Sequence, residues 1–313
     1  MSGSPLNAAH PVPEAVCALV VTYRCGAGVG PSLSSLLPQV GKILVIDNGS
    51  GEETLAFLEG VRLRWPDHFV IHSLPENIGI AGALNLGMRK AMAMGFGWVL
   101  TMDHDSEAAP DLVARLIEAI SHCPDPGKVL VSAPVSIDQE TGEPGVLPAY
   151  SGWRKRVLSS RAGSAELLYP DVVIASGNLV DLRLCGEAPF DETLFIDYVD
   201  HDFCLKGKDR GLSIVCVPRA VLRHRVGNRI SRNLLGRRIS CTNHPAGRRY
   251  YQARNLVEMV RRYGRRRPGY ALDIVKSFLR DILGIFLLEE GRGEKIRAIA
   301  RGVLDSGRHF RRT

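Results

Sequence analysis

The sequence lacks the cysteine patterns that mark metal–thiolate sites and disulfide frameworks. It contains seven cysteines, an odd number, and no two of them form a Cys-x-x-Cys pair. Structural zinc sites and disulfide-rich secreted domains usually show such spacings. Both classes are therefore disfavoured, and a reducing cytoplasm is the expected compartment.

Targeting and membrane-spanning segments are also lacking. The stretch from Met1 to Pro5 has neither the basic segment nor the apolar core of a secretory signal peptide. The longest apolar stretch in the C-terminal region, 282–288, is much shorter than the roughly 20 residues that cross a bilayer. We expect a flexible lead-in over residues 1–15 and no membrane-spanning helix.

Two common nucleotide-binding fingerprints are missing. There is no Gly-Lys-Ser/Thr of a Walker A loop, and Gly26, Gly28 and Gly30 do not have the Gly-x-Gly-x-x-Gly spacing. A P-loop protein and a Rossmann-type dehydrogenase are therefore disfavoured. Aromatic residues make up only 6% of the chain. This scarcity argues against a protein that stacks single-stranded nucleic acid on aromatic side chains, so no nucleic-acid partner is expected.

The net charge of +7 hides an uneven distribution. From Arg219 onward, 24 Lys and Arg face 7 Asp and Glu, whereas the first 218 residues hold 16 basic and 26 acidic residues. A basic region of this kind suggests an anionic partner, namely a membrane surface, nucleic acid or a phosphorylated ligand. The region also shows amphipathic helical patterns at 248–263, 270–288 and 294–303. These helices could lie on an anionic membrane or pack on the preceding domain.

The first two thirds of the chain alternate apolar runs of strand length with helical patterns. Continuous apolar runs are typical of parallel strands that are buried on both faces. The alternation predicts an α/β fold with a mostly parallel, doubly wound sheet. The expected strands are 16–23, 42–46, 69–72, 98–102, 129–135 and 172–180, with 212–218 as an edge strand. The expected helices are 31–39, 53–65, 80–94 and 110–121, and residues 138–165 are expected to form loops or a hairpin.

Carboxylates follow two of the predicted strands. Asp103 and Asp105 come directly after the run 98–102, and Asp47 follows the run 42–46. Residues i and i+2 of an extended chain point to the same side, so Asp103 and Asp105 can face one divalent cation. Ligands of open α/β sheets bind at the carboxyl ends of the strands. The simpler alternative is that these residues cap the next helix and solvate a loop.

A second acidic cluster contains Asp197, Asp200 and Asp202, and it precedes an amphipathic segment that ends at Gly211. Helix capping needs one or two acids, whereas this cluster has three among apolar neighbours. Desolvation in such surroundings would raise the pKa of a carboxylate toward that of a useful base. Farther along, His224 lies between two arginines. A lone histidine is usually structural, but beside two acidic clusters His224 is also a candidate metal or diphosphate ligand.

These motifs resemble, in their order and spacing, the family 2 glycosyltransferases with the GT-A fold. The motifs that carry this resemblance are Val-Ile-Asp-Asn-Gly-Ser, Glu-Asn-Ile-Gly-Ile-Ala-Gly-Ala-Leu-Asn and Met-Asp-His-Asp-Ser. Three later motifs are similar to the bacterial rhamnosyltransferase branch, which uses dTDP-L-rhamnose. They are Ser-Gly-Asn-Leu-Val, Leu-Phe-Ile-Asp-Tyr-Val-Asp-His-Asp-Phe-Cys-Leu-Lys and Leu-Arg-His-Arg-Val-Gly. The resemblance covers about residues 16–260.

The resemblance implies a role for each motif. Asp200 stands at the position of the catalytic base, and Asp105 with His224 would bind Mg²⁺ or Mn²⁺. The residues expected at the donor are Tyr23, Asp47, Asn77, Gly79 and Asp103. The residues expected on the acceptor side are Asp197, Asp202, Ser176, Gly177 and Asn178. The chain departs from many relatives by having Val199 before Asp200 and Lys206 in place of an Arg. These departures leave open whether Asp197, Asp200 or Asp202 is the base.

The resulting expectation is a metal-dependent, inverting glycosyltransferase of cell-surface polysaccharide synthesis. It would move L-rhamnose from dTDP-L-rhamnose to a glycan or lipid-linked glycan, in the cytoplasm or peripherally at the inner face of the cell membrane. The expected organisation is a catalytic domain over 16–227 and a basic helical extension over 228–313. The alternatives are a transferase of the same fold that uses another nucleotide sugar, and a non-enzymatic nucleic-acid-binding protein.

Overall fold

The computed structural model describes residues 11–159, 166–186, 189–225, 229–234 and 237–309. Most of the predicted lead-in and the expected domain boundary at 227/228 therefore lie outside the described residues. The chain divides into two compact units. The sheet unit comprises Met1–Leu147, Leu158–Glu192 and Asp200–Arg225. The helical unit comprises Pro148–Val157, Thr193–Val199 and Val226–Thr313.

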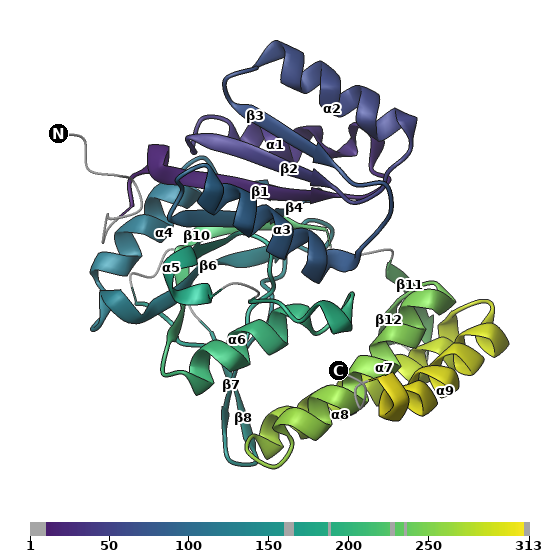
Figure 1. Ribbon diagram of the computed structural model, residues 1–313. Helices are drawn as coiled ribbons and strands as arrows, with labels where there is room; N and C mark the ends of the chain where they lie inside the picture. The colour runs from purple at the N-terminus through teal and green to yellow at the C-terminus, as the bar shows by residue number, and fades with distance from the viewer. Residues whose placement is uncertain (1–10, 160–165, 187–188, 226–228, 235–236, 310–313) are drawn as a thin grey trace. The chain divides into compact units, whose positions relative to one another are not determined.

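The sheet unit is built on an eight-stranded sheet with the order β3-β2-β1-β4-β9-β6-β10-β5. Its strands are β1 (Val16–Thr22), β2 (Lys42–Asp47), β3 (Phe69–Ser73), β4 (Trp98–Asp103), β5 (Ser106–Ala108), β6 (Val129–Asp138), β9 (Asn178–Asp181) and β10 (Ser213–His224). Every residue of β1 is buried, as its continuous apolar run predicts. Strands β2, β1 and β4 pair in parallel, which confirms the predicted, mostly parallel sheet (Figure 1).

Two strands run opposite to the other six. The short β9 lies between β4 and β6 and is antiparallel to both, and β5 pairs antiparallel with the end of β10. The edge strand predicted at 212–218 is longer than expected, because β10 continues to His224, and its last three residues pair with β5 on the side opposite β6. Its register against β6 shifts between Val217 and Val221. Pro218 falls in this irregularity, where a missing backbone N–H is tolerated, so the proline does not end the strand.

Helices cover both faces of the sheet. They are α1 (Gly30–Leu36), α2 (Glu52–Arg64), α3 (Gly79–Ala93) and α4 (Leu112–Ser121), followed by the short α5 (Leu182–Cys185) and by α6 (Val199–Asp209). Ala18 and Val20 of β1 join a core with Leu33 of α1 and Leu116 of α4. Leu19 points to the opposite face, where it meets Gly87 of α3 so closely that a Cβ there would lie 2.2 Å from the leucine.

The helical unit contains the three predicted C-terminal helices. These are α7 (Ala246–Tyr263), α8 (Pro268–Leu288) and α9 (Arg292–His309). Two hairpins accompany them: β7 (Leu147–Ser151) with β8 (Arg154–Leu158), and β11 (Arg229–Leu234) with β12 (Arg237–Thr242). The first hairpin confirms one of the expectations for 138–165, whereas the second was not predicted.

A buried ionic cluster holds the three C-terminal helices together. Glu289, after α8, lies 2.6 Å from Arg249 of α7 and 2.6 Å from Lys295 of α9. The side chains of Arg249 and Glu289 are fully buried. Each buried charge is therefore compensated by its partner, since an unpaired ion in this place would strongly destabilise the fold. Among the residues that the structure describes, no helix is both long enough and apolar enough to cross a membrane.

Candidate active site

Asp103, Asp105 and His224 come together in the sheet unit. Each offers one ligand atom, and these atoms lie within 4.8 Å of one another. Asp103 ends β4, Asp105 lies in the turn after it, and His224 ends β10. The antiparallel pairing of β5 with β10 places Ser106 opposite His224 in register. This pairing brings together two segments that are far apart in the sequence, and the structure thus groups three predicted site residues.

Two buried serines orient this cluster. Nδ1 of His224 lies 2.8 Å from Oγ of Ser106, which in turn lies 2.8 Å from Oγ of Ser176. Oγ of Ser176 also accepts a hydrogen bond from the backbone N–H of Asp103, at 3.0 Å. The hydrogen bond at Nδ1 fixes the plane of the imidazole ring, as partners of metal-binding histidines commonly do. Ser106 was not predicted, because only the β5–β10 pairing reveals its neighbour.

The electrostatics of the cluster favour a cation. Burial raises the pKa of Asp103 above its ordinary value, His224 opposes this rise, and the carboxylates of Asp105 and Asp200 add to it. A positive ion at this place would relieve the repulsion between the carboxylates. Two carboxylates and one imidazole are donors that suit Mg²⁺ or Mn²⁺. The side chains present therefore fit a divalent metal ion.

Asp47 is fully buried at the end of β2. Its Oδ1 accepts a hydrogen bond from the hydroxyl of Thr22 at 2.9 Å, and its Oδ2 accepts one from the backbone N–H of Ser50 at 3.0 Å. Asp47 thus shapes the turn between β2 and α2. Tyr23, which follows β1, is 38% exposed, and the guanidinium of Arg24 lies 5.1 Å from its ring. Contacts of Asp47 and Tyr23 with a donor stay predictions.

Asn77 and Gly79 form the entry to α3. Oδ1 of Asn77 accepts hydrogen bonds from the N–H of Gly79 at 2.8 Å and from Nδ2 of Asn48 at 3.1 Å. Oδ1 of Asn48 in turn accepts from the N–H of Ile78, at 2.9 Å. Asn48 therefore ties the turn after β2 to the start of α3. Asn48 was not among the predicted site residues, and its place directly after Asp47 at a strand end was the one signal of its role.

Ser176, Gly177 and Asn178 precede or begin β9. Gly177 has φ = 82°, and its N–H donates to the carbonyl of Thr101 at 2.7 Å. Nδ2 of Asn178 donates to the carbonyl of Ile174 at 2.7 Å. Ser176 belongs to the cluster around Asp103 through its hydrogen bonds, and its contact with an acceptor stays a prediction. The roles of Gly177 and Asn178 seen here are local, and their contact with an acceptor stays a prediction.

The three carboxylates around α6 have different surroundings. Asp202 is fully buried and lies 2.7 Å from Nζ of Lys206. Asp197 belongs to the helical unit, where Arg248 lies 2.9 Å from its Oδ1. Asp200, in the first turn of α6, is half-buried, and its Oδ1 accepts from the N–H of His201 at 2.9 Å. Ion pairing thus holds Asp197 and Asp202, which leaves Asp200 as the strongest candidate for a base.

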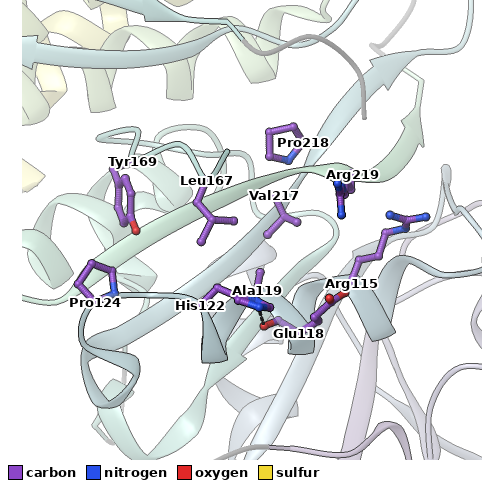
Figure 2. A pocket seen from close by; sticks show the side chains of 10 residues that line it. All are labelled: Arg115, Glu118, Ala119, His122, Pro124, Leu167, Tyr169, Val217, Pro218 and Arg219. Atoms are coloured by element: carbon purple, nitrogen blue, oxygen red, sulfur yellow. Dashed lines mark hydrogen bonds between the residues drawn. The ribbon is translucent and has the colours of Figure 1, made fainter. Parts of the chain in front are cut away.

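A cavity of about 440 Å³ lies elsewhere in the sheet unit. Figure 2 shows its lining, which includes Arg115, His122, Tyr169 and Arg219. Nδ1 of His122 lies 3.0 Å from the carbonyl oxygen of Glu118 in this lining. None of the predicted site residues lines the cavity. We therefore place the candidate active site at the strand ends, where the titratable groups converge.

Comparison with known proteins identifies the domain. The sequence model of the family described as Glycosyl transferase family 2 matches residues 17–162. Residues 17–162 thus match a family 2 glycosyltransferase domain. The transferase is 27% identical to the dTDP-rhamnosyl transferase RfbF of Shigella flexneri over 254 residues, which make up 79% of this chain and 80% of RfbF. It is 28% identical to the galactofuranosyltransferase GlfT1 of Mycobacterium tuberculosis over 51% of this chain and 52% of GlfT1.

Solved structures confirm the predicted GT-A fold of the transferase. The mannosyltransferase PcManGT of Pyrobaculum calidifontis, in complex with GDP-Man and Mn²⁺, superposes with a TM-score of 0.56 at 15% identity. That match covers 97% of this chain and 80% of PcManGT. Residues 1–349 of Staphylococcus aureus TarS, in complex with UDP-GlcNAc, give a TM-score of 0.51 at 15% identity, over 93% of this chain and 81% of TarS.

Proposed function

We propose that this glycosyltransferase is metal-dependent and inverting, and that it transfers L-rhamnose from dTDP-L-rhamnose. The observation that carries the proposal is the convergence of Asp103, Asp105 and His224 in a domain of this family. Such a set of donors suits a nucleotide diphosphate with its cation. The choice of sugar rests on the similarity to RfbF over most of both chains.

Asp105 and His224 would hold Mg²⁺ or Mn²⁺, with Asp103 beside them. When bound, the ion would neutralise the nucleotide diphosphate that leaves the sugar. The serines Ser106 and Ser176 keep the histidine ring and the Asp103 backbone in place. Asp47, Asn77 and Gly79 would border the nucleoside, and Asn48 would keep that border ordered through its hydrogen bonds to the start of α3.

Asp200 would act as the general base. Its carboxylate takes the proton of the acceptor hydroxyl while that oxygen attacks the anomeric carbon. The bond between the anomeric carbon and the diphosphate oxygen breaks, and the nucleotide diphosphate leaves with the electron pair. Attack from the opposite face in a single displacement inverts the anomeric configuration. The charge of Asp200 contributes to the raised pKa of Asp103, which supports a place for Asp200 in the neighbourhood of the carboxylate cluster.

The acceptor in this proposal is a glycan or lipid-linked glycan of cell-surface polysaccharide synthesis. Ser176, Gly177, Asn178, Asp197 and Asp202 remain the predicted acceptor-side residues. The second candidate function is a transferase of the same fold with another nucleotide sugar. The similarity to a galactofuranosyltransferase over half of the chain favours it.

We further propose that the helical unit touches the inner face of the cell membrane. Helix α8 exposes Leu272, Leu279, Leu283 and Phe286, at 40–58% of their surface. Lys276 and Arg280 of the same helix are exposed as well. An apolar stripe beside basic residues suits the surface of an anionic bilayer. All seven cysteines are free thiols, and six of them are buried, which agrees with a reducing cytoplasm.

A panel of nucleotide sugars, each with Mn²⁺ and with chelator, tests the donor and the metal by thermal shift. A ligand at a hundredfold excess over its Kd should stabilise the protein by about 2.7 kcal/mol. We expect dTDP-L-rhamnose to stabilise most, and chelator to remove the effect. Stabilisation by another nucleotide sugar alone would support the second candidate, and stabilisation by none of them would contradict both.

The variant Asp200→Asn tests the chemistry separately. It keeps the size of the side chain but removes its basicity, so transfer should be abolished while donor binding remains. Donor stabilisation in the thermal-shift assay serves as the control for an intact site. Near-normal turnover in this variant would refute the assignment of Asp200 as the base.

A further inference from the structure

The segment that leads into α6 has an unusual backbone. Phe195, Asp197 and Tyr198 all have φ = 62°, and none of them is a glycine. The left-handed region is costly for any residue with a Cβ atom. Such conformations persist only where the surrounding structure imposes them, and they are frequent at functional sites. The segment 193–198 therefore needs a partner that holds it.

Asn255 of α7 makes most of the side-chain contacts to the backbone of the segment 193–198. It is fully buried, and its Nδ2 lies 2.7, 2.8 and 3.2 Å from the carbonyl oxygens of Leu194, Ile196 and Asp197. An amide nitrogen has two N–H donors, so three carbonyls converge on two hydrogens. Oδ1 of Asn255 accepts from Nε of Arg254 at 3.0 Å, which fixes the orientation of the amide.

Arg254 holds the start of the same segment. It is 4% exposed, and its Nη2 donates to the carbonyl oxygens of Thr193 at 2.6 Å and Leu194 at 3.2 Å. Its guanidinium lies 4.9 Å from the ring of Tyr251, which stacks on Phe195 with 4.8 Å between the ring centroids. Arg254 thus donates hydrogen bonds to the backbone of the segment and contacts Tyr251, the ring that stacks on Phe195.

A salt bridge of Asp197 also binds the segment to α7. Arg248, six residues before Arg254 on α7, donates to both carboxylate oxygens of Asp197 at 2.9–3.3 Å. Three residues of one helix therefore bind one short segment through its carbonyls and its side chain. The segment continues directly through Tyr198 and Val199 into the first turn of α6, where Asp200 stands.

We propose that Asn255 and Arg254 are positioning residues for the carboxylate of Asp200. By holding 193–198 in its left-handed conformation, they fix the backbone that leads directly into the first turn of α6, which carries Asp200. The proposal rests on the proposed role of Asp200 as the base. It explains why two polar side chains are buried against loop carbonyls, where apolar residues would have sufficed for packing.

The test compares Asn255→Ala with Val257→Ala, a change at a more exposed position of the same helix. Removing the amide lets the segment relax, and a displacement of about 1 Å at a reacting group can lower a rate by about a hundredfold. We expect kcat for rhamnosyl transfer to fall by roughly 10- to 100-fold in Asn255→Ala. The Kd of dTDP-L-rhamnose with Mn²⁺ should stay within about threefold, because the donor cluster does not include α7. Val257→Ala should leave both quantities unchanged.

The outcomes separate this proposal from the proposed function. If Asp200→Asn is inactive while folded Asn255→Ala keeps normal kcat, the positioning proposal fails and the proposed function stands. If Asp200→Asn keeps its turnover, Asp200 is not the base, and the positioning proposal fails together with that assignment. A parallel loss of kcat and donor affinity in Asn255→Ala would indicate a merely structural role and overturn the proposal. Should Asn255→Ala not fold, Arg254→Lys replaces it, because lysine keeps the charge but loses the planar fork.

Discussion

Gly49→Ala tests how the turn after β2 supports the entry to α3. Gly49 has φ = 82°, and a Cβ added there would lie 2.6 Å from the carbonyl carbon of Glu76 and 2.8 Å from the backbone nitrogen of Asn77. These are backbone atoms, so they cannot move aside as a flexible side chain would. Gly211 provides a matched control in the same unit. It has φ = 76°, and a Cβ there meets open space.

Both substitutions force an alanine into a left-handed conformation, but only Gly49→Ala also creates a steric clash with backbone atoms. A left-handed conformation costs an alanine about 1–2 kcal/mol relative to glycine. Gly211→Ala should therefore lower the free energy of unfolding by about 1–2 kcal/mol. Gly49→Ala adds an overpacked contact, which typically costs a further 1–3 kcal/mol or so, for a total of about 2–5 kcal/mol. The displaced Asn77 should also weaken donor binding, because its side chain orders the proposed nucleoside border.

Urea unfolding of both variants measures the costs, and titration with the nucleotide sugar measures the Kd. We expect a larger loss of stability in Gly49→Ala than in Gly211→Ala, together with weaker donor binding in Gly49→Ala alone. Equal losses of stability would show that the turn yields without strain and would refute the steric reasoning. An unchanged donor Kd in Gly49→Ala would show that Asn77 does not border the bound nucleoside.

Three further predictions concern separate parts of the molecule. Ser106→Ala removes the hydrogen bond to His224 and should weaken Mn²⁺ binding by about 10- to 100-fold in a metal titration; unchanged binding would contradict the orienting role. Glu289→Ala leaves a buried arginine without its carboxylate and should cost about 3–5 kcal/mol in urea unfolding. Glu59→Ala, which removes an exposed ion pair, should cost far less, and similar costs would refute the argument. The pair Leu279→Glu and Leu283→Glu should lower sedimentation with anionic vesicles at least tenfold or so, and undiminished binding would exclude the α8 stripe.

Local patterns predicted most of the sheet, because each parallel strand is an apolar run that is buried on both faces. The strand β9 shows the limit of such patterns. Its residues, Asn178–Asp181, are all buried, as those of a parallel strand are, and their direction depends on where the chain returns to the sheet. Pro218 shows a second limit. A proline normally ends a strand, but the register shift in β10 leaves the missing N–H without consequence, and no local signal reveals that shift.

The candidate site was predictable where chemistry and strand ends coincide. Asp103 and Asp105 follow an apolar run, and the structure groups them with His224 as the sequence predicted. The choice among the three carboxylates near α6 was not predictable. It depends on the partners of Asp197 and Asp202, and the partner of Asp197 comes from a helix about fifty residues later. Hydrogen bonds and ion pairs between distant segments produce no periodic pattern in a sequence, so such partners could not be predicted from it.

The three-residue pairing between β5 and β10 has a consequence for folding and synthesis. Asp105 and His224 are separated by more than a hundred residues, and β10 must insert between β6 and β5 before they can meet. Closing so long a loop is entropically slow, so the pairing belongs to the late events of folding. A chain that is still emerging from the ribosome has no complete Asp103–Asp105–His224 cluster until residue 224 is available. In the proposed function, metal and donor would therefore bind the finished sheet, and we expect their binding to protect the last strand to arrive from opening again.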